Sequence, residues 1–132
     1  MRDISTIPRI SLAQLPTPLY RLPNISARTG KNVYIKRDDM TGVALGGNKV
    51  RKLEFLLAHA LQEGCDYVLT TGGAQSNHAM LTAACCNRLG LHCILVLKKR
   101  GVCDKKGNQL LDDLLGADVR FVDTDDYADV YA

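Results

Sequence analysis

A lysine stands where a helix is expected to begin, directly behind two glycines and an asparagine. The stretch runs Gly46-Gly47-Asn48-Lys49-Val50-Arg51-Lys52, and Asn48 is suited to the N-cap position. A helix start disfavours a further cation, and Arg51 and Lys52 add positive charge within one turn. These influences favour the neutral amine of Lys49, the form that attacks an aldehyde. The alternative is a solvated lysine at a frayed helix start.

The same loop does not match a nucleotide-binding P-loop. Gly42 and Gly47 have the required four residues between them, but Asn48 stands where that motif has its lysine. Val50 follows Lys49, so no hydroxyl group is available there for magnesium. We therefore do not expect a nucleotide phosphate at this loop.

A second glycine-led turn lies between a β-rich run and a helical stretch. It extends from Thr70 to His78 and ends in Ser76, Asn77 and His78, which offer a hydroxyl, an amide and an imidazole. Turns at the carboxyl ends of parallel strands bind ligands. Glycines let the backbone approach a ligand, and a helix start presents amide donors to an anion. The alternative is a capping turn with Ser76 or Asn77 as N-cap. A Ser–His dyad is not expected, because no acidic residue is adjacent.

The elements that must position these turns are marked by three evenly spaced glycines. Gly64, Gly90 and Gly116 lie 26 residues apart, and each ends an apolar-periodic stretch and precedes a β-rich run. The pattern predicts helices over about 50–61, 77–89 and 108–115, and strands over 66–70, 92–97 and 118–122. The strands are largely apolar, as in strands buried on both faces. The expected fold class is α/β, a parallel sheet with flanking helices.

The first helix has a clear apolar stripe, with Arg51, Glu54 and Gln62 elsewhere on its surface. The stripe consists of Val50, Leu53, Leu56, Leu57, Ala60 and Leu61. The acidic residues of the second half are expected to form a solvated face with helix caps; they are Asp112, Asp113, Asp123, Asp125 and Asp126.

The first 45 residues differ from the rest. Leu15-Pro16-Thr17-Pro18-Leu19 is an extended, proline-fixed stretch, and 33–36 is a predicted strand. We expect 1–45 to belong to a larger domain and 46–132 to form a smaller α/β domain. Thr124-Asp125-Asp126 is typical of a helix cap and first turn, yet the sequence stops at Ala132. The chain is therefore expected to be truncated.

Composition favours an ordinary soluble protein. Of the 132 residues, 46% are hydrophobic and 23% charged, and the net charge of +3 comes from scattered basic residues, so nucleic-acid binding is not expected. No apolar run is long enough for a membrane span or a secretory signal. The odd cysteine count and the absence of Cys-x-x-Cys indicate small buried side chains in a reducing compartment, the cytoplasm, without a zinc site. The cysteines are Cys65, Cys85, Cys86, Cys93 and Cys103.

Four stretches together resemble the D-cysteine desulfhydrase and 1-aminocyclopropane-1-carboxylate deaminase family. They are Leu15 to Leu19, Lys36-Arg37-Asp38-Asp39, Gly46 to Glu54, and Gly73-Ala74-Gln75-Ser76-Asn77-His78, with a weaker match over 107–119. The resemblance covers essentially the whole chain. It implies pyridoxal 5'-phosphate enzymes of the tryptophan-synthase-β fold group, an incomplete copy of that fold here, and a homodimer in the full-length protein.

The resemblance also implies residue roles. Lys49 matches the lysine that carries the cofactor and later acts as a base, and Ser76 matches an active-site serine near the substrate. Asn77 matches an asparagine that contacts the pyridine-ring hydroxyl, and Lys52 a lysine near the cofactor phosphate. Ser76, Asn77 and His78 would contact a small amino-acid substrate. The implied reaction on D-cysteine is a β-elimination that yields pyruvate, ammonia and sulfide.

Two departures from the family pattern bear on the substrate and on the activity. His78 matches the desulfhydrase-like branch, whereas the deaminases tend to have glutamine there; Met80 stands where many relatives have a basic residue. Family members are also considerably longer, and the phosphate loop and the partner of the pyridine nitrogen lie in the part that this sequence lacks. Three interpretations stay open: a D-cysteine lyase, an aminocyclopropane-carboxylate deaminase, and a catalytically silent α/β fragment or binding module.

Overall fold

The computed structural model describes residues 3–99 and 105–124. Within these ranges the helices and strands follow in the order of the chain. They are η1 (Ile4–Thr6), β1 (Leu19–Arg21), α1 (Pro23–Thr29), β2 (Tyr34–Lys36), η2 (Asp38–Met40), α2 (Lys49–Gln62), β3 (Tyr67–Gly73), α3 (Asn77–Leu89), β4 (His92–Lys98), α4 (Asn108–Leu114) and β5 (Asp118–Val122).

The second half folds as the predicted α/β unit. Strands β3, β4 and β5 form a parallel sheet in that order, with Tyr67 opposite His92 and Ile94 opposite Asp118. Gly64, Gly90 and Gly116 all have positive φ angles of 68–76° just after the helices, the conformation that glycine adopts most readily. The regular glycine spacing therefore reflects three helix ends, each followed by a strand.

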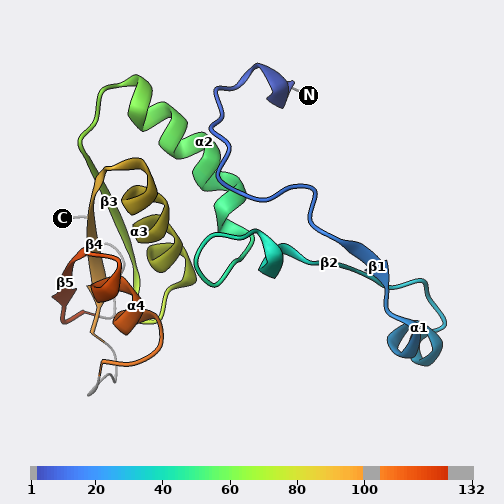
Figure 1. Cartoon of the computed structure of the whole chain (residues 1–132). Helices are drawn as coiled ribbons and strands as arrows, with labels where there is room; N and C mark the ends of the chain where they lie inside the picture. The colour runs from blue at the N-terminus through green and yellow to red at the C-terminus, as the bar shows by residue number, and fades with distance from the viewer. Residues whose placement is uncertain (1–2, 100–104, 125–132) are drawn as a thin grey trace.

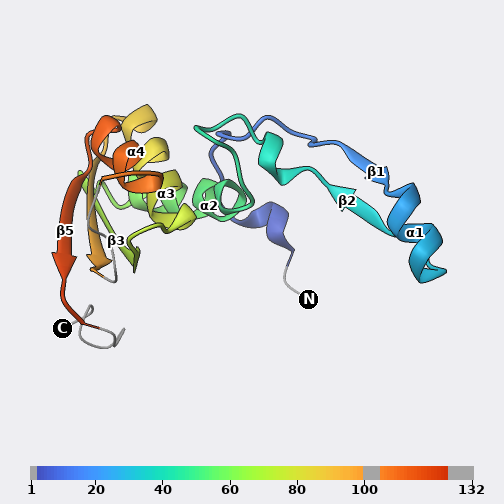
Figure 2. The ribbon, with the colours of Figure 1, turned by 90° about the horizontal axis from the view of Figure 1, so that it is seen from below.

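Both crossover helices lie on the same face of this sheet. Figures 1 and 2 show α3 and α4 on the side of the sheet that also faces α2. Because the strands are added in one direction, successive right-handed crossovers return on one side. The expectation that the strands are buried on both faces is thus wrong for the outer strands: Tyr67 and Leu69 of β3 and Phe121 of β5 are exposed. Only the central β4 has mostly buried side chains.

The core lies between α2, α3 and β4. Helix α3 is almost wholly enclosed, from Ala79 to Cys86. It packs against Val50, Leu53 and Leu57 of α2 on one side and against the sheet on the other. Burial of these side chains supplies most of the driving force for the unit.

The helical stripe predicted for α2 is only partly correct. Leu56 and Leu61 were expected in the core but are 55% and 40% exposed, whereas Glu54 is fully buried. Glu54 Oε1 accepts hydrogen bonds from the backbone N–H groups of Leu12 and Ala13 at 2.9 and 2.8 Å, and Oε2 accepts from Arg9 Nε at 2.7 Å. A buried carboxylate is tolerated when it is paired in this way.

Strands β1 and β2 and helix α1 form an arm that projects from the α/β unit (Figures 1 and 2). Strands β1 and β2 pair antiparallel, with Tyr20 opposite Ile35, and α1 connects them. The sequence analysis missed β1 and α1, although Pro23 at the start and Gly30, with φ 66°, at the end are typical helix boundaries. The predicted strand at 33–36 is confirmed as β2.

Two further expectations need correction. Asp112 on α4 is 1% exposed rather than solvated, and its burial, with a smaller contribution from Asp113, raises its pKa to about 6. Cys65 is exposed, whereas Cys85, Cys86 and Cys93 are buried as expected. Cys103 and the helix predicted after Thr124 lie outside the described residues. Among the helices within 3–99 and 105–124, none has the length and apolarity of a membrane span.

Candidate functional site

The loop before α2 is held in one shape by close backbone contacts. Buried Thr41 accepts a hydrogen bond from the Gly47 N–H at 3.1 Å. A Cβ atom on Gly46, where φ is 72°, would lie 1.7 Å from the Asp39 carbonyl oxygen. A Cβ on Gly47 would lie 3.0 Å from Leu81 of α3. The two glycines therefore allow this loop to fold tightly and to set the start of α2 against α3.

Lys49 is the first residue of α2, as predicted, and it is half-buried. Asn48 occupies the N-cap position, but its side chain makes no capping hydrogen bond there. Lys52, three residues on, is exposed. The amine of Lys49 thus extends from the positive end of a 14-residue helix.

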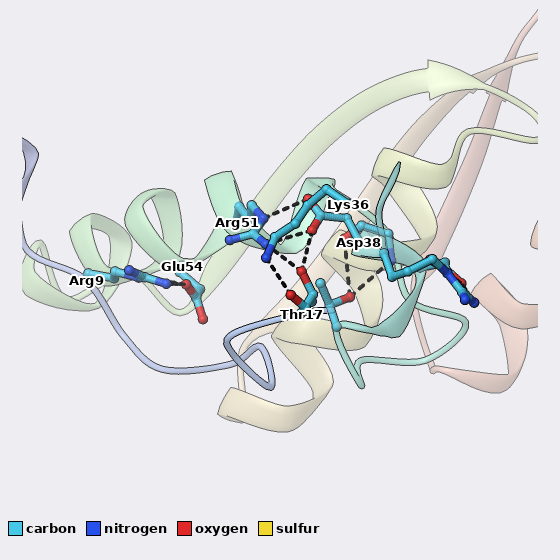
Figure 3. Close-up of polar contacts among 10 residues, drawn as sticks. Arg9, Thr17, Lys36, Asp38, Arg51 and Glu54 are labelled. Carbon is cyan, nitrogen blue, oxygen red and sulfur yellow. Dashed lines mark hydrogen bonds and ion pairs between the residues drawn. The ribbon is translucent and has the colours of Figure 1, made fainter. Parts of the chain in front are cut away.

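Arg51 does not act as the free cation that the sequence analysis assumed. Its Nε and Nη2 atoms donate to Asp38 Oδ2 and Oδ1 at 2.7 and 2.6 Å (Figure 3). The hydrogen bonds from Arg51, with a smaller contribution from Thr17, lower the pKa of Asp38 to about 2 despite its partial desolvation. The carboxylate therefore compensates the guanidinium charge, whereas Lys52 forms no ion pair with any residue in 3–99 or 105–124.

Thr17 connects this ion pair to the extended N-terminal stretch. Its hydroxyl donates to Asp38 Oδ1 at 2.9 Å and accepts from Arg51 Nη2 at 3.0 Å, while Lys36 Nζ donates to the Thr17 carbonyl oxygen (Figure 3). Three segments of the resemblance, at Thr17, at Lys36 to Asp38 and at Arg51, therefore meet at one polar cluster. This cluster fixes the first turn of α2 to the arm.

The second predicted turn follows β3 at the carboxyl end of the parallel sheet. Ser76 is the N-cap of α3, and its hydroxyl accepts a hydrogen bond from the Ala79 N–H at 3.2 Å. A Cβ on Gly72 would lie 2.8 Å from the Ser76 side chain, so the turn requires glycine there. Next to it, no heavy atom of the described residues lies within 4 Å of where a Gly73 Cβ would be. Gly73 thus faces open space at the strand end.

His78 shows that the two turns lie close together. Burial lowers the pKa of its imidazole, and the charges of Lys52 and Lys49 lower it further. Its Nδ1 atom is buried and makes no hydrogen bond to any residue in the described ranges. A neutral imidazole with an unsatisfied buried nitrogen therefore stands beside the lysines of α2 and is suited to a ligand group.

The start of α4 contacts Asn77, and the sequence analysis did not predict this contact. Asn108 Nδ2 donates to Asn77 Oδ1 at 2.7 Å and to the Gln75 carbonyl oxygen at 3.0 Å. These residues are 31 and 33 positions apart in the chain, so local periodicity does not reveal the contact. The only signal was the weaker family match at Gly107 and Asn108.

Together these groups fit an anionic ligand that carries an aldehyde. The start of α3 offers backbone donors, Asn77 and Ser76 offer polar side chains, and Lys49 offers an amine nearby. Lys49 and Lys52 lie near enough to His78 for their charges to lower its pKa after the larger effect of burial, and Ser76, Asn77 and His78 follow one another at the start of α3.

Comparisons with known proteins relate the chain to one family. Residues 10–132 match the family model described as pyridoxal-phosphate dependent enzyme. The chain is 50% identical over 92% of its length to a Pyrococcus abyssi protein provisionally named 1-aminocyclopropane-1-carboxylate deaminase, and 45% identical over 93% to D-cysteine desulfhydrase of Salmonella paratyphi B. A crystal structure titled as an ACC deaminase homologue superposes with a TM-score of 0.90 and 47% identity over 97% of this chain. The chain spans 36% to 39% of the length of these relatives.

Proposed function

The chain belongs to the family of pyridoxal-phosphate-dependent enzymes, and on that premise we propose that it carries the cofactor lysine, Lys49, of an amino-acid lyase. The observation that carries the proposal is the half-buried Lys49 at the first turn of α2, within electrostatic range of His78 on the glycine-led turn. A lysine near a ligand-binding strand end is the arrangement that this cofactor needs.

The residues present fit pyridoxal 5'-phosphate. Lys49 would bind its aldehyde carbon, the carboxamide of Asn77 would contact the ring hydroxyl, and Lys52 would lie near the phosphate. Two observations support a ligand here: His78 Nδ1 has no hydrogen-bond partner among the described residues, and a Cβ on Gly73 would meet none of their heavy atoms within 4 Å. The bound cofactor would supply an electron sink for a carbanion at the substrate Cα.

The side chains of this chain then have separate tasks. The amine of Lys49 would take the proton from the substrate Cα. Ser76 would bind the substrate carboxylate or assist proton transfer through its hydroxyl. His78, whose pKa is lowered by burial and by the two lysines, would accept a hydrogen bond as a neutral base.

We propose D-cysteine or a related small β-substituted amino acid as the substrate. D-cysteine and one water would give pyruvate, ammonia and hydrogen sulfide, with loss of the Cβ–sulfur bond. Support comes from His78 and from the similarity to D-cysteine desulfhydrases. The alternative is 1-aminocyclopropane-1-carboxylate deamination, which the 50% identity to the Pyrococcus protein favours.

The substrate proposal is tested by two assays on the full-length protein. Sulfide release from D-cysteine should be faster than ammonia release from 1-aminocyclopropane-1-carboxylate, with Lys49→Ala as the background control. The reverse order would replace the desulfhydrase proposal by the deaminase.

We further propose that 1–45 joins a larger domain, that the full-length protein is a cytoplasmic homodimer, and that the 132 residues alone are inactive. The projecting arm exposes Leu19, Tyr20, Ile25 and Tyr34, which supports a contact with further chain. The isolated 132-residue chain should bind the cofactor weakly. Tight stoichiometric binding by this chain would contradict the proposal.

A further inference from the structure

The turn that bears Asn77 is tied to the start of α4 by a directional chain of amide hydrogen bonds. It begins at Gln75, whose Oε1 accepts from the Asn108 backbone N–H at 2.9 Å and whose Nε2 donates to the Lys106 carbonyl oxygen at 2.9 Å. A backbone N–H can only donate and a carbonyl can only accept. The orientation of the Gln75 amide is therefore fixed by its partners.

The same reasoning fixes the next two amides. Asn108 Nδ2 donates to the Gln75 carbonyl oxygen at 3.0 Å, so this atom must be the nitrogen. It also lies 2.7 Å from a side-chain atom of Asn77, which must accept and is therefore Oδ1. The two Nδ2 protons of Asn77 are left on the opposite side of its carboxamide.

The start of α4 is shaped for this contact. Gly107 has φ 61° and ψ −131°, and a Cβ on it would lie 2.5 Å from Gln75 Oε1. Only glycine allows the chain to pass so close to the Gln75 amide. Asn108 then makes two hydrogen bonds to Gln75, in the turn between β3 and α3, and one to Asn77, the first residue of α3.

We propose that Asn108 is a positioning residue that sets the Asn77 carboxamide as a hydrogen-bond donor, never an acceptor, toward the ligand. The inference rests on the proposed function: the ligand oxygen would be the ring hydroxyl of pyridoxal phosphate. Asn108 acts through Asn77 and needs no contact with the ligand itself. Gln75, which accepts from the Asn108 backbone N–H and donates to the Lys106 carbonyl oxygen, fixes the direction of this series of hydrogen bonds.

The test uses the full-length protein loaded with cofactor, and the variants Asn108→Ala, Asn77→Ala and their combination. The readout is the pH midpoint of the absorbance of the bound cofactor. Negative charge on the ring oxygen favours a bound proton on the nitrogen that Lys49 contributes. A hydrogen-bond donor to the ring oxygen reduces this charge and so weakens the hold on that proton. Loss of one hydrogen bond should therefore raise the midpoint by about half to one pH unit.

Asn87→Ala is the matched control. Asn87 Nδ2 donates to the Leu115 carbonyl oxygen at 3.1 Å and so also joins α3 to the α4 region, but at the far end of α3. Asn108→Ala and Asn77→Ala should shift the midpoint upward, the double variant should shift it no further, and Asn87→Ala should leave it at the wild-type value. A wild-type midpoint for Asn108→Ala, or additive shifts in the double variant, would overturn the inference.

A second readout separates this inference from the proposed function. Failure of the wild-type protein to take up cofactor would refute the proposed function. The amide order is tested independently by NMR of the side-chain amide protons of the ligand-free protein. Those of Asn108, both hydrogen-bonded, should exchange with solvent more slowly than those of Asn77. Equal exchange rates would overturn the inference.

Discussion

Replacement of Glu54 by alanine should detach the N-terminal segment from α2 at a large cost in stability. Glu54 is fully buried, and its Oε1 is the acceptor for the N–H groups of Leu12 and Ala13, which are themselves buried. In the alanine variant both N–H groups lose their acceptor inside the protein. A buried donor without a partner costs about 1–3 kcal/mol.

The magnitude follows from which partners can return to water. The Arg9 side chain is 43% exposed, so its guanidinium is rehydrated when the carboxylate is removed and contributes about 0–1 kcal/mol. The two backbone groups dominate. Glu54→Ala should therefore lower the free energy of unfolding by about 2–6 kcal/mol, whereas Arg9→Ala, which leaves both backbone donors bonded to Oε1, should lower it by less.

The pH dependence of stability is an independent test of the Glu54 interaction. Burial raises the pKa of Glu54, but the hydrogen bonds from Ala13, Leu12 and Arg9 outweigh it, so the pKa is lower than the ordinary value of 4.5. Because the folded-state pKa is depressed, the stabilisation is present above the unfolded-state pKa and is lost as the pH falls through the folded-state pKa. Glu54→Gln should remove this acid-dependent part of the stability.

The assay is denaturant unfolding of the full-length wild-type, Glu54→Ala, Glu54→Gln and Arg9→Ala proteins from about pH 3 to about pH 8, a range that includes the ordinary carboxyl titration. The exposed α2 residue Gln62, replaced by alanine, serves as the control for helix propensity. Glu54→Ala with wild-type stability, or with no greater loss than Arg9→Ala, would refute the reasoning.

Two other buried or paired acids should behave differently. Asp112→Asn should stabilise the protein by about 3 kcal/mol above pH 6. The folded-state pKa of Asp112 is about 6, so stability that is present below the ordinary value of 3.8 is lost as the pH rises through 6. Asp66→Asn, at an exposed acid, is the control, and wild-type stability that stays constant between about pH 4 and 7 would contradict the assignment. Asp38→Asn should destabilise the protein by about 1 kcal/mol at neutral pH, because it breaks the pair of hydrogen bonds with Arg51. Since the pKa of Asp38 is about 2, this stability should be present above pH 3.8 and lost toward pH 2. The same pH dependence of stability in the wild type and in Asp38→Asn would refute this prediction.

Local patterns were sufficient to predict the α/β unit. The helix over 77–89 and the strand over 118–122 were predicted with the bounds that α3 and β5 have. The reason is that Gly90 and Gly116 stop helices through their own backbone conformation. The same local chemistry gave Ser76 and Asn77 as alternative N-caps of α3, and Ser76 occupies that position.

Features set by distant partners could not be predicted in this way. Glu54 is buried because Leu12 and Ala13, 42 and 41 residues away, present donors to it. Arg51 is neutralised by Asp38, and Asn77 is oriented by Asn108. Each contact depends on the tertiary fold, whereas hydrophobic periodicity reports only the residue's own helix or strand.

The central claim is that the amine of Lys49 binds the cofactor aldehyde. The most direct measurement is reduction of the cofactor-loaded full-length protein with borohydride, followed by peptide mass mapping. We expect one modified peptide with the added mass on Lys49, and loss of both the label and the yellow absorbance in Lys49→Ala. A label on another lysine, or unchanged absorbance in Lys49→Ala, would contradict it.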